Sequence, residues 1–343
     1  MGQGEGLNIW NKGGALTHLN TRMPTGEDVT QRSDLKPAFS DELFERVLQR
    51  GNLQAAWKRV RANKGAAGID GLTIDEFPEW AKAGGWEAVI ADLKTGRYKP
   101  SPVRRVEIEK PDGGTRQLGI PTITDRVIQQ AIAQVLTPVF DPGFSNNSFG
   151  FRPGRNGQQA VKQVQRIIKE GRRIAVDVDL SKFFDRVNHN LLMTHLGYKV
   201  KDKRLLKLIN LYLRAGVIDN QLYRESREGV PQGGPLSPLL ANILLDSLDK
   251  ELERRGHKFA RYADDFTILV KSRRAGERVL HSISQFLQNR LKLVINTTKS
   301  HVVKTSESKF LGFTFRRGRI QWHPETMLKF KRKIRQLTNR NWG

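Results

Sequence analysis

Two short apolar segments that carry paired carboxylates constrain the fold of this chain more than any other feature. The first, FARYADDFTILV (259–270), is mostly apolar on both sides of two adjacent aspartates, which predicts a strand, a sharp acidic turn and a second strand. The second, RIAVDVD (173–179), alternates with a period of two, which predicts a strand with one buried face. We expect the two segments to lie side by side in one sheet.

Amphipathic helices are predicted around these strands. One begins after Thr124 as N-cap and is stopped by Pro138; a second covers residues 161–168; a third begins with Ser237 as N-cap and Pro238 in its first turn. Strands and helices together predict an α+β fold.

A basic hairpin is predicted at residues 103–120. Residues 103–109 alternate like a strand, residues 111–114 (PDGG) form a tight turn, and the chain returns as a second strand. The hairpin carries Lys110 and Arg116.

Charge indicates the class of partner. The 343 residues include 59 Lys and Arg against 35 Asp and Glu, a formal net charge of +24. Such an excess suits a polyanion, because each neutralised phosphate releases counterions. The absence of cysteine excludes disulfides, cysteine-ligated zinc and a cysteine nucleophile. No run of 18 apolar residues occurs, so we expect an intracellular nucleic-acid binder without a membrane span.

Two loops leave alternatives open. The Gly-rich basic loop 63–71 lacks the ending of a P-loop, and a plain connection is favoured over a phosphate site. The segment SFGFRPGR (148–155) interleaves aromatic residues with arginines. It suits base stacking and phosphate contacts, and a structured loop with two core phenylalanines explains it equally well.

The carboxylates of the two strand segments indicate the chemistry. Adjacent aspartates are more often a solvated turn, or neutralised by Arg or Lys, than a metal site. If the two segments pair, however, Asp179 joins Asp264 and Asp265 at one sheet edge. Three such carboxylates suit two divalent cations of the kind used for displacement at phosphorus. Asp177 is expected to pair with a nearby arginine.

Tyr262-Ala263-Asp264-Asp265 in a hairpin is similar to the YxDD motif of reverse transcriptases. The run from about residue 43 to 322 resembles the reverse-transcriptase domain of bacterial group II intron-encoded proteins, which are reverse transcriptases and maturases. The resemblance rests on eight stretches in family order: GIDGLTIDEF (68–77), KPDGGTRQLGIPTITDRVIQQAI (110–132), SFGFRPGR (148–155), VDVDLSKFFDRVNH (176–189), GVPQGGPLSPLLANILLDSLD (229–249), RYADDFTILV (261–270), NTTKS (296–300) and KFLGFTF (309–315).

The resemblance implies a right-hand polymerase that performs RNA-directed DNA synthesis. Its palm would be an antiparallel sheet backed by helices, and its thumb would be mostly absent. It implies that Asp179, Asp264 and Asp265 hold two Mg²⁺ ions, for which Mn²⁺ can substitute, with the Leu180 carbonyl as a further ligand. The segment 310–315 corresponds to the region that grips the primer.

The resemblance also implies residues for the nucleotide. Lys110 and Arg116 match the cations that clamp the incoming triphosphate, and Gln232 matches a residue near its sugar and the template base. Phe184 matches the aromatic gate that crowds a ribose 2′-OH and favours deoxynucleotides. Lys299 matches the lysine that protonates the pyrophosphate leaving group.

The expected domains follow the same resemblance: a loosely ordered extension (1–39), fingers (40–171), palm (172–319) and the start of a thumb and maturase region (320–343). Relatives continue into a helical thumb and maturase region, so we expect either a fragment or a naturally short protein.

The partners implied are an RNA template, a DNA primer, deoxynucleoside triphosphates and group II intron RNA, in a cytoplasmic, nucleoid-associated ribonucleoprotein. Monomer and homodimer both stay open. One rival function is a truncated RNA-binding or splicing factor that no longer polymerises. Another is an RNA-dependent RNA polymerase, against which Phe184 and the sequence YADD speak.

Overall fold

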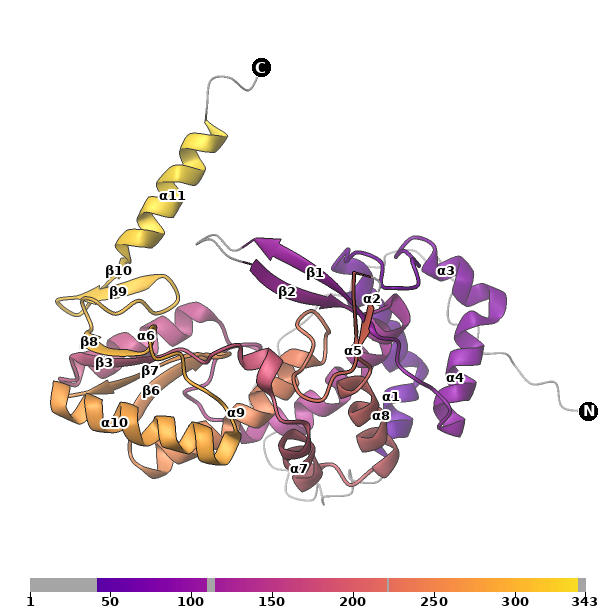
Figure 1. Cartoon of the computed structure of the whole chain (residues 1–343), viewed down its shortest axis with the longest axis horizontal. Helices are drawn as coiled ribbons and strands as arrows, with labels where there is room; N and C mark the ends of the chain where they lie inside the picture. Colours follow the sequence, from indigo (N-terminus) through magenta and orange to yellow (C-terminus); the bar gives the residue numbers. More distant parts are fainter. Residues whose placement is uncertain (1–41, 110–114, 221, 339–343) are drawn as a thin grey trace, which may run out of the picture. The chain divides into compact units, whose positions relative to one another are not determined.

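The computed structural model describes residues 42–109, 115–220 and 222–338 (Figure 1). The expected extension 1–39, Lys110 with the turn 111–114, and the last five residues lie outside the described residues. The chain divides into two compact units that alternate along the sequence. Unit 1 takes in Met1–Leu136, Leu196–Ser226 and Gln232–Pro235; unit 2 takes in Thr137–His195, Arg227–Pro231 and Leu236–Gly343.

These units are not the contiguous stretches expected for fingers and palm. Both contain segments from either side of residue 171, because helices and strands distant in sequence pack together. The assignment of fingers, palm and thumb to the chain stays a prediction.

Unit 1 combines helices with a four-stranded sheet of order β2-β1-β4-β5. β1 pairs antiparallel with β2 and parallel with β4, and β4 pairs antiparallel with β5. The two strands of the predicted basic hairpin are confirmed on either side of residues 110–114, with Glu109 opposite Thr115. The strands are β1 (Val103–Glu109), β2 (Thr115–Ile120), β4 (Val217–Asp219) and β5 (Leu222–Arg224). The helices are α1 (Leu43–Leu48), α2 (Arg50–Ala62), α3 (Phe77–Trp80), α4 (Trp86–Thr95), most of α5 (Ile123–Phe140) and α8 (Lys203–Leu213), with a π-helical turn at Ala81–Gly85.

Unit 2 is organised around an antiparallel sheet of order β6-β7-β3-β8, as the α+β prediction requires. The two carboxylate-bearing segments are neighbours in it, because β3 pairs with β7 from Ile174 opposite Val270 to Val178 opposite Phe266. The strands are β3 (Ile174–Val178), β6 (Lys258–Tyr262), β7 (Asp265–Val270) and β8 (His301–Lys304), and a separate hairpin consists of β9 (Phe313–Arg316) and β10 (Arg319–Trp322).

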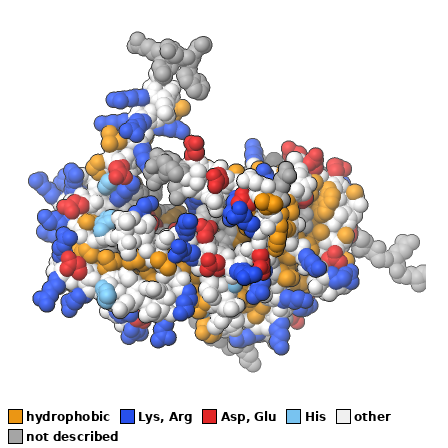
Figure 2. All heavy atoms as spheres, viewed as in Figure 1, with side chains coloured by type: hydrophobic (Ala, Val, Ile, Leu, Met, Phe, Trp, Pro, Cys, Tyr) orange, Lys and Arg blue, Asp and Glu red, His pale blue; other side chains and the backbone are white. Residues whose placement is uncertain are grey.

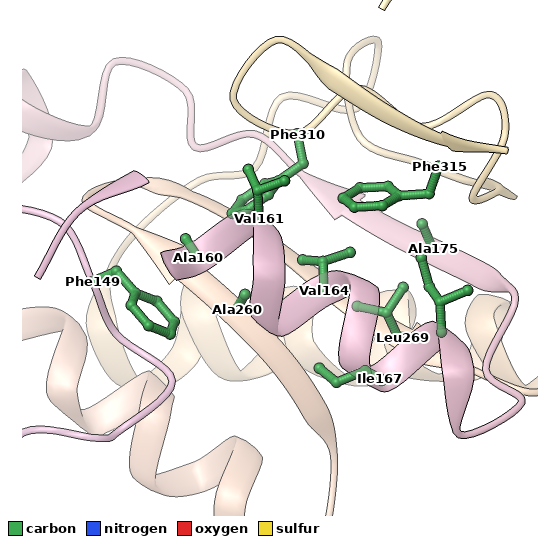
Figure 3. Packing of buried hydrophobic residues seen from close by; sticks show 11 residues of the cluster. Phe149, Ala160, Val161, Val164, Ile167, Ala175, Ala260, Leu269, Phe310 and Phe315 are labelled. Carbon is green, nitrogen blue, oxygen red and sulfur yellow. The ribbon is translucent and has the colours of Figure 1, made fainter. Parts of the chain in front are cut away.

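Helices cover both faces of this sheet (Figure 1). On one face, α6 (Gly157–Lys169) buries its apolar stripe in a cluster that also takes Ala175, Ala260 and Leu269 from the strands. Figure 3 shows Phe310 and Phe315 of the C-terminal segment lying against the same helix. On the other face lies α10 (Arg273–Phe286), where a Cβ on Gly276 would be 2.5 Å from Val302. The remaining helices are α7 (His189–Lys199), α9 (Ser237–Arg254) and α11 (Pro324–Leu337), with short helical turns at Asp141–Gly143, Phe183–Arg186 and Leu287–Leu291.

Two predicted helix starts and one predicted stop are wrong. Thr122, and not Thr124, accepts the hydrogen bond of a first-turn amide, from Asp125 N at 3.1 Å. The hydroxyl of Ser237 donates to the Pro231 carbonyl and caps nothing, since the residue before α9 is Leu236. Pro138 lies inside α5, which continues to Phe140. Proline removes only one helical hydrogen bond near the end of the helix, and burial of Phe140 holds the last turn against the core.

The last helix differs from the others because α11 buries none of its residues. Its exposed side chains include apolar ones as well as many Lys and Arg, which appear in blue along the projecting helix in Figure 2. No helix in the described ranges is both long and apolar enough to cross a membrane.

Candidate active site

The three predicted carboxylates lie at one end of the unit 2 sheet. Asp179 directly follows β3, Asp265 opens β7, and Asp264 occupies the turn between β6 and β7. Since Val178 is the register partner of Phe266, the next residues outward on the two strands are Asp179 and Asp265. The convergence of the two motifs at one sheet edge is therefore confirmed.

The turn that carries the carboxylates is tight. Tyr262 pairs with Asp265, so only Ala263 and Asp264 connect the strands, and Ala263 takes a φ of 57°. Another segment packs directly on this turn: a Cβ on Gly150 would lie 2.2 Å from the Ala263 nitrogen. Only glycine allows that approach of two backbones.

A buried polar network anchors the turn, and sequence reasoning missed it. Arg261 is fully buried, and its guanidinium donates to both carboxylate oxygens of Asp249 at 2.8 and 2.5 Å. The same guanidinium donates to the Asn242 side chain and to the Ala263 carbonyl, both at 2.9 Å. Asn242 in turn donates to the Gly150 carbonyl at 2.9 Å. We call Arg261, Asp249 and Asn242 the turn-anchoring network. Its sequence signal is an arginine inside an otherwise apolar strand.

A second segment fixes the end of β3. The hydroxyl of Ser300 accepts from the Asp179 amide at 3.0 Å, and the Asn296 amide donates to the Asp179 carbonyl at 2.8 Å. Leu180 forms a β-bridge with Ile295. Lys299 belongs to the same turn and is exposed. The NTTKS motif therefore hydrogen-bonds to the backbone at Asp179. Lys299 lies in this motif and is thus held on the same structural unit as Asp179.

The carboxyl group of Asp265 is in an unfavourable environment for a negative charge. Solvent reaches its side chain, but the surrounding protein atoms, followed by the charges of Asp177, Asp264 and Asp179, raise the pKa of Asp265 to about 7. A hydrogen bond from the Leu311 amide opposes this rise. Asp265 forms no ion pair within the described residues, so the interpretation of the acidic pair as neutralised by Arg or Lys does not hold for it.

Asp177 does not pair with an arginine, contrary to the sequence expectation. Its carboxylate accepts from the Ser308 hydroxyl at 3.1 Å and lies 3.6 Å from Nε2 of His301. Strand pairing decides this outcome, because β8 places His301 directly opposite Asp177. Burial raises the pKa of Asp177, and its contacts with Thr267, Ser308 and His301 oppose the rise.

The carboxylates act on one another electrostatically without forming a ready-made ligand cage. Among the described residues no three His, Asp or Glu side chains are grouped tightly enough to hold a metal ion. The oxygen donors nevertheless fit a hard divalent cation, which prefers carboxylates and would relieve their mutual repulsion. The two Mg²⁺ ions and their four ligands stay a prediction.

Phe184, the predicted gate residue, is buried at 6% exposure beside Phe183, with ring centroids 5.0 Å apart. Its carbonyl accepts from the Val230 amide at 2.6 Å. A Cβ on Gly229 would lie 2.9 Å from the Asp185 carbonyl oxygen, so glycine is needed where this segment crosses. The role of Phe184 as a gate stays a prediction.

Two of the predicted nucleotide-binding residues meet in unit 1. The Arg116 side chain donates to the Gln232 side chain at 2.7 Å, and the Gly119 amide donates to the Gln232 carbonyl at 2.7 Å. Gly233, with φ of 123°, allows the same close approach, since its Cβ would lie 2.6 Å from the Gly119 oxygen. The PQG turn is thereby fixed to β2.

For the loops 63–71 and 148–155, the contacts within the protein favour a structured connection over a phosphate or base-stacking site. In loop 63–71 the carbonyls of Ala66 and Ala67 accept from Arg126 and Arg104 of unit 1 itself, as expected of a structured connection. In the segment 148–155 the rings divide: Phe149 is in the core and Phe151 is 52% exposed.

The arginines of the segment 148–155 bind its own surroundings. Arg152 donates to Asp141 at 2.7 Å and to two backbone carbonyls of residues 145–148, and Arg155 donates to Asn146 at 2.9 Å. The structured-loop interpretation therefore accounts for most of this segment.

The expected primer-grip segment contributes to the core as well as to the site. Phe310 and Phe315 are buried at 1% and 2% exposure against α6 (Figure 3). Between them Leu311 has a φ of 50° and directs its amide to Asp265. The segment thus connects the hydrophobic core to the carboxylates.

Comparison with known proteins identifies the family to which this chain belongs. Residues 108–315 match the family model described as reverse transcriptase (RNA-dependent DNA polymerase). The group II intron-encoded protein LtrA of Lactococcus lactis subsp. cremoris is 32% identical over 80% of this chain and 57% of its own length. Protein YkfC of Escherichia coli (strain K12) is 33% identical over 82% of this chain and 84% of its own. This chain therefore spans little more than half of LtrA.

Solved structures share the fold. The telomerase of Candida albicans, in complex with a fragment of telomeric RNA, superimposes with a TM-score of 0.51 at 13% identity, covering 77% of this chain and 56% of that one. That level of identity supports the fold alone. Together with the family match, these relatives show that the chain belongs to the reverse transcriptase (RNA-dependent DNA polymerase) family and carries the reverse transcriptase domain of group II intron-encoded proteins.

Proposed function

We propose that this chain is an RNA-directed DNA polymerase of the group II intron type, which adds deoxynucleotides to a DNA primer on an RNA template. The observation that carries the proposal is the convergence of Asp179, Asp264 and Asp265 at one sheet edge, where the pKa of Asp265 rises to about 7. Structural carboxylates are normally paired or solvated, and a group of like charges at one edge indicates a ligand set.

Divalent cations, Mg²⁺ with Mn²⁺ as a substitute, supply charge neutralisation at the transferred phosphoryl group when bound. Asp179, Asp264 and Asp265 would hold them, with the Leu180 carbonyl as a further oxygen donor. The turn-anchoring network and the Ser300 contact keep two of these carboxylates in register.

The remaining roles concern the nucleotide. Arg116, with Lys110, would bind the triphosphate, and its hydrogen bond to Gln232 would orient both side chains. Phe184 would exclude a ribose 2′-OH, and Lys299, exposed on the turn that holds Asp179, would donate the proton to the pyrophosphate.

We also propose fingers at residues 40–171, a palm at 172–319 and the start of a thumb at 320–343. Template RNA and intron RNA are the proposed macromolecular partners, and the net charge of +24 supports them.

The test is incorporation of a single nucleotide on an RNA template with a DNA primer, with dNTP or NTP and with or without Mg²⁺. Asp264→Asn removes a proposed ligand on a turn without opening a cavity, so we expect at least about a 100-fold loss of rate with folding intact. The control is Asp75→Asn, the same chemical change at an exposed residue outside the site, with full activity expected. A rate within tenfold of wild type for Asp264→Asn would contradict the metal assignment.

The same assay separates the rival functions. A splicing or RNA-binding factor without polymerase activity would bind the RNA and incorporate nothing. An RNA-dependent RNA polymerase would use NTP at least as well as dNTP.

A further inference from the structure

Unit 2 contains a basic groove that the proposed catalytic residues do not use. Its volume is about 950 Å³, and it lies where α6 ends and β3 begins, bordered by β8 and the β9–β10 hairpin. Five basic residues line it: Lys169, Arg173, Lys304, Arg317 and Arg319. We call this site the basic groove. None of the described residues that line it is acidic.

The five cations are available to a ligand. All five are exposed, and none forms an ion pair with another described residue. The acidic residue next to Lys169 in sequence, Glu170, pairs instead with Arg172 at 3.2 Å. Cations brought together without counter-charges repel one another, and an anion bound among them relieves that repulsion.

Backbone contacts give the basic groove a fixed shape. The Thr305 amide donates to the Arg173 carbonyl at 3.0 Å, and the Phe315 amide donates to the Thr305 carbonyl at 3.1 Å. The Gln165 side chain donates to the Gly318 carbonyl at 2.8 Å, which ties the β9–β10 turn to α6. The cations therefore project from a preformed scaffold, as a binding site requires.

The basic groove is separate from the carboxylates. It includes Ile174, the first residue of β3, whereas Asp179 follows the last residue of that strand. Five residues of extended chain span about 16 Å. A nucleotide that reacts at the carboxylates does not reach this end of the sheet with the same phosphates.

The lining also indicates which part of a nucleic acid it contacts. Its single aromatic residue, Phe315, is only 2% exposed, so no ring is offered for base stacking. Single strands are typically bound by exposed aromatic rings, whereas folded RNA is recognised through backbone phosphates.

We propose that the basic groove binds the backbone phosphates of a folded RNA segment, outside the path of template and primer. The identity of the ligand as RNA rests on the proposed function. The groove would give the protein a hold on structured RNA that does not depend on the nucleotide being copied.

The test compares two triple variants of the full chain with equal loss of charge. The groove variant carries Lys169→Gln, Arg173→Gln and Lys304→Gln. The matched control carries Lys271→Gln, Arg274→Gln and Arg278→Gln, three exposed cations at and after the end of β7, outside the groove and without ion pairs among the described residues. The probe is an RNA hairpin with no primer annealed, titrated at several salt concentrations.

Counterion release gives the expected loss of RNA affinity in the groove variant. Each lost phosphate contact lowers the log–log salt slope by about 0.7–0.9. The three substitutions should therefore lower the slope by about 2–3 and weaken RNA binding by about 100- to 500-fold near 0.1 M salt. The control should match wild type in slope and affinity. Equal behaviour of the two variants would overturn the proposal.

Two further measurements separate the alternatives. Single-nucleotide incorporation at saturating template–primer should be unchanged in the groove variant, and a loss above threefold would place the groove in the catalytic path and overturn the proposal. Millimolar inorganic phosphate or dNTP should not displace the hairpin, since displacement would indicate a small-nucleotide site instead. If wild type incorporates nothing, the proposed function fails, yet the hairpin comparison still decides the groove.

Discussion

Replacing Asp249 by Asn tests whether the turn-anchoring network positions the carboxylates. The Arg261–Asp249 pair is fully buried on both sides and doubly hydrogen-bonded. Asp249→Asn keeps the size of the side chain and one acceptor oxygen, but it leaves the Arg261 charge in the interior without a counter-charge.

The burial of this pair sets the expected loss in the free energy of unfolding. Breaking a buried ion pair by removing one partner destabilises a protein by about 3–5 kcal/mol, because the remaining charge stays desolvated. That is a large share of the roughly 5–15 kcal/mol that holds a typical domain together. Hydrogen exchange across β6 and β7 should therefore accelerate by roughly 10²–10⁴-fold where exchange reports unfolding of this sheet.

Hydrogen exchange followed by mass spectrometry locates the effect, and urea unfolding gives its total size. The control is Glu277→Gln, which breaks an exposed ion pair with Arg273. The two charged atoms lie 3.2 Å apart, and the side chains of Glu277 and Arg273 are 59% and 74% exposed. An exposed pair of this kind contributes about 0.5 kcal/mol or less. A loss below about 1 kcal/mol for Asp249→Asn would refute the reasoning.

A double variant separates stability from positioning. Asp249→Leu with Arg261→Met removes both charges, so the free energy of unfolding should lie between that of the single variant and that of wild type. The double variant also removes the Arg261 donor to the Ala263 carbonyl, so nucleotide incorporation should be low even where stability is partly restored. Full activity in the double variant would show that the turn holds its shape without the network.

Three further outcomes are expected. Without Mg²⁺, Asp265 contributes a stability that is present at low pH and declines as the pH rises from about 4 through 7, because its pKa is higher in the folded state than in the unfolded state. Asp265→Asn should therefore flatten this part of the pH–stability curve measured in EDTA. An unchanged curve would contradict the raised pKa of Asp265. Gly150→Ala should destabilise by about 1–3 kcal/mol and slow incorporation, since its Cβ meets the Ala263 backbone at 2.2 Å, whereas Gly197→Ala, with open space in α7, should be neutral or stabilising in the same urea titration. Phe184→Val should lower the ratio of kcat/KM for dNTP to that for NTP, measured by single-nucleotide incorporation, and an unchanged ratio would remove its role as gate.

Local sequence pattern was sufficient for the strands that carry the carboxylates and for the position of each carboxylate at a strand end. The period-two alternation before Asp179 and the apolar runs around Asp264 specify which residues face the core and where each strand ends. These properties depend on neighbours within a few residues. The strands of the basic hairpin likewise follow from local alternation. The expectation of a polyanionic partner needs only the composition.

Partners across the fold were decided only by tertiary structure. Asp177 meets His301 because β8 joins the sheet beside β3, and the helix with Pro138 continues because its end is packed. Arg261 is separated from Asp249 by a helix end and a loop, and the Arg116–Gln232 contact joins residues 116 positions apart. Periodicity tells which side of an element is buried, but it carries no information on what packs there. The basic groove is the clearest case, since its cations come from three separate stretches of chain and lie around one groove only because helix, sheet and hairpin pack together.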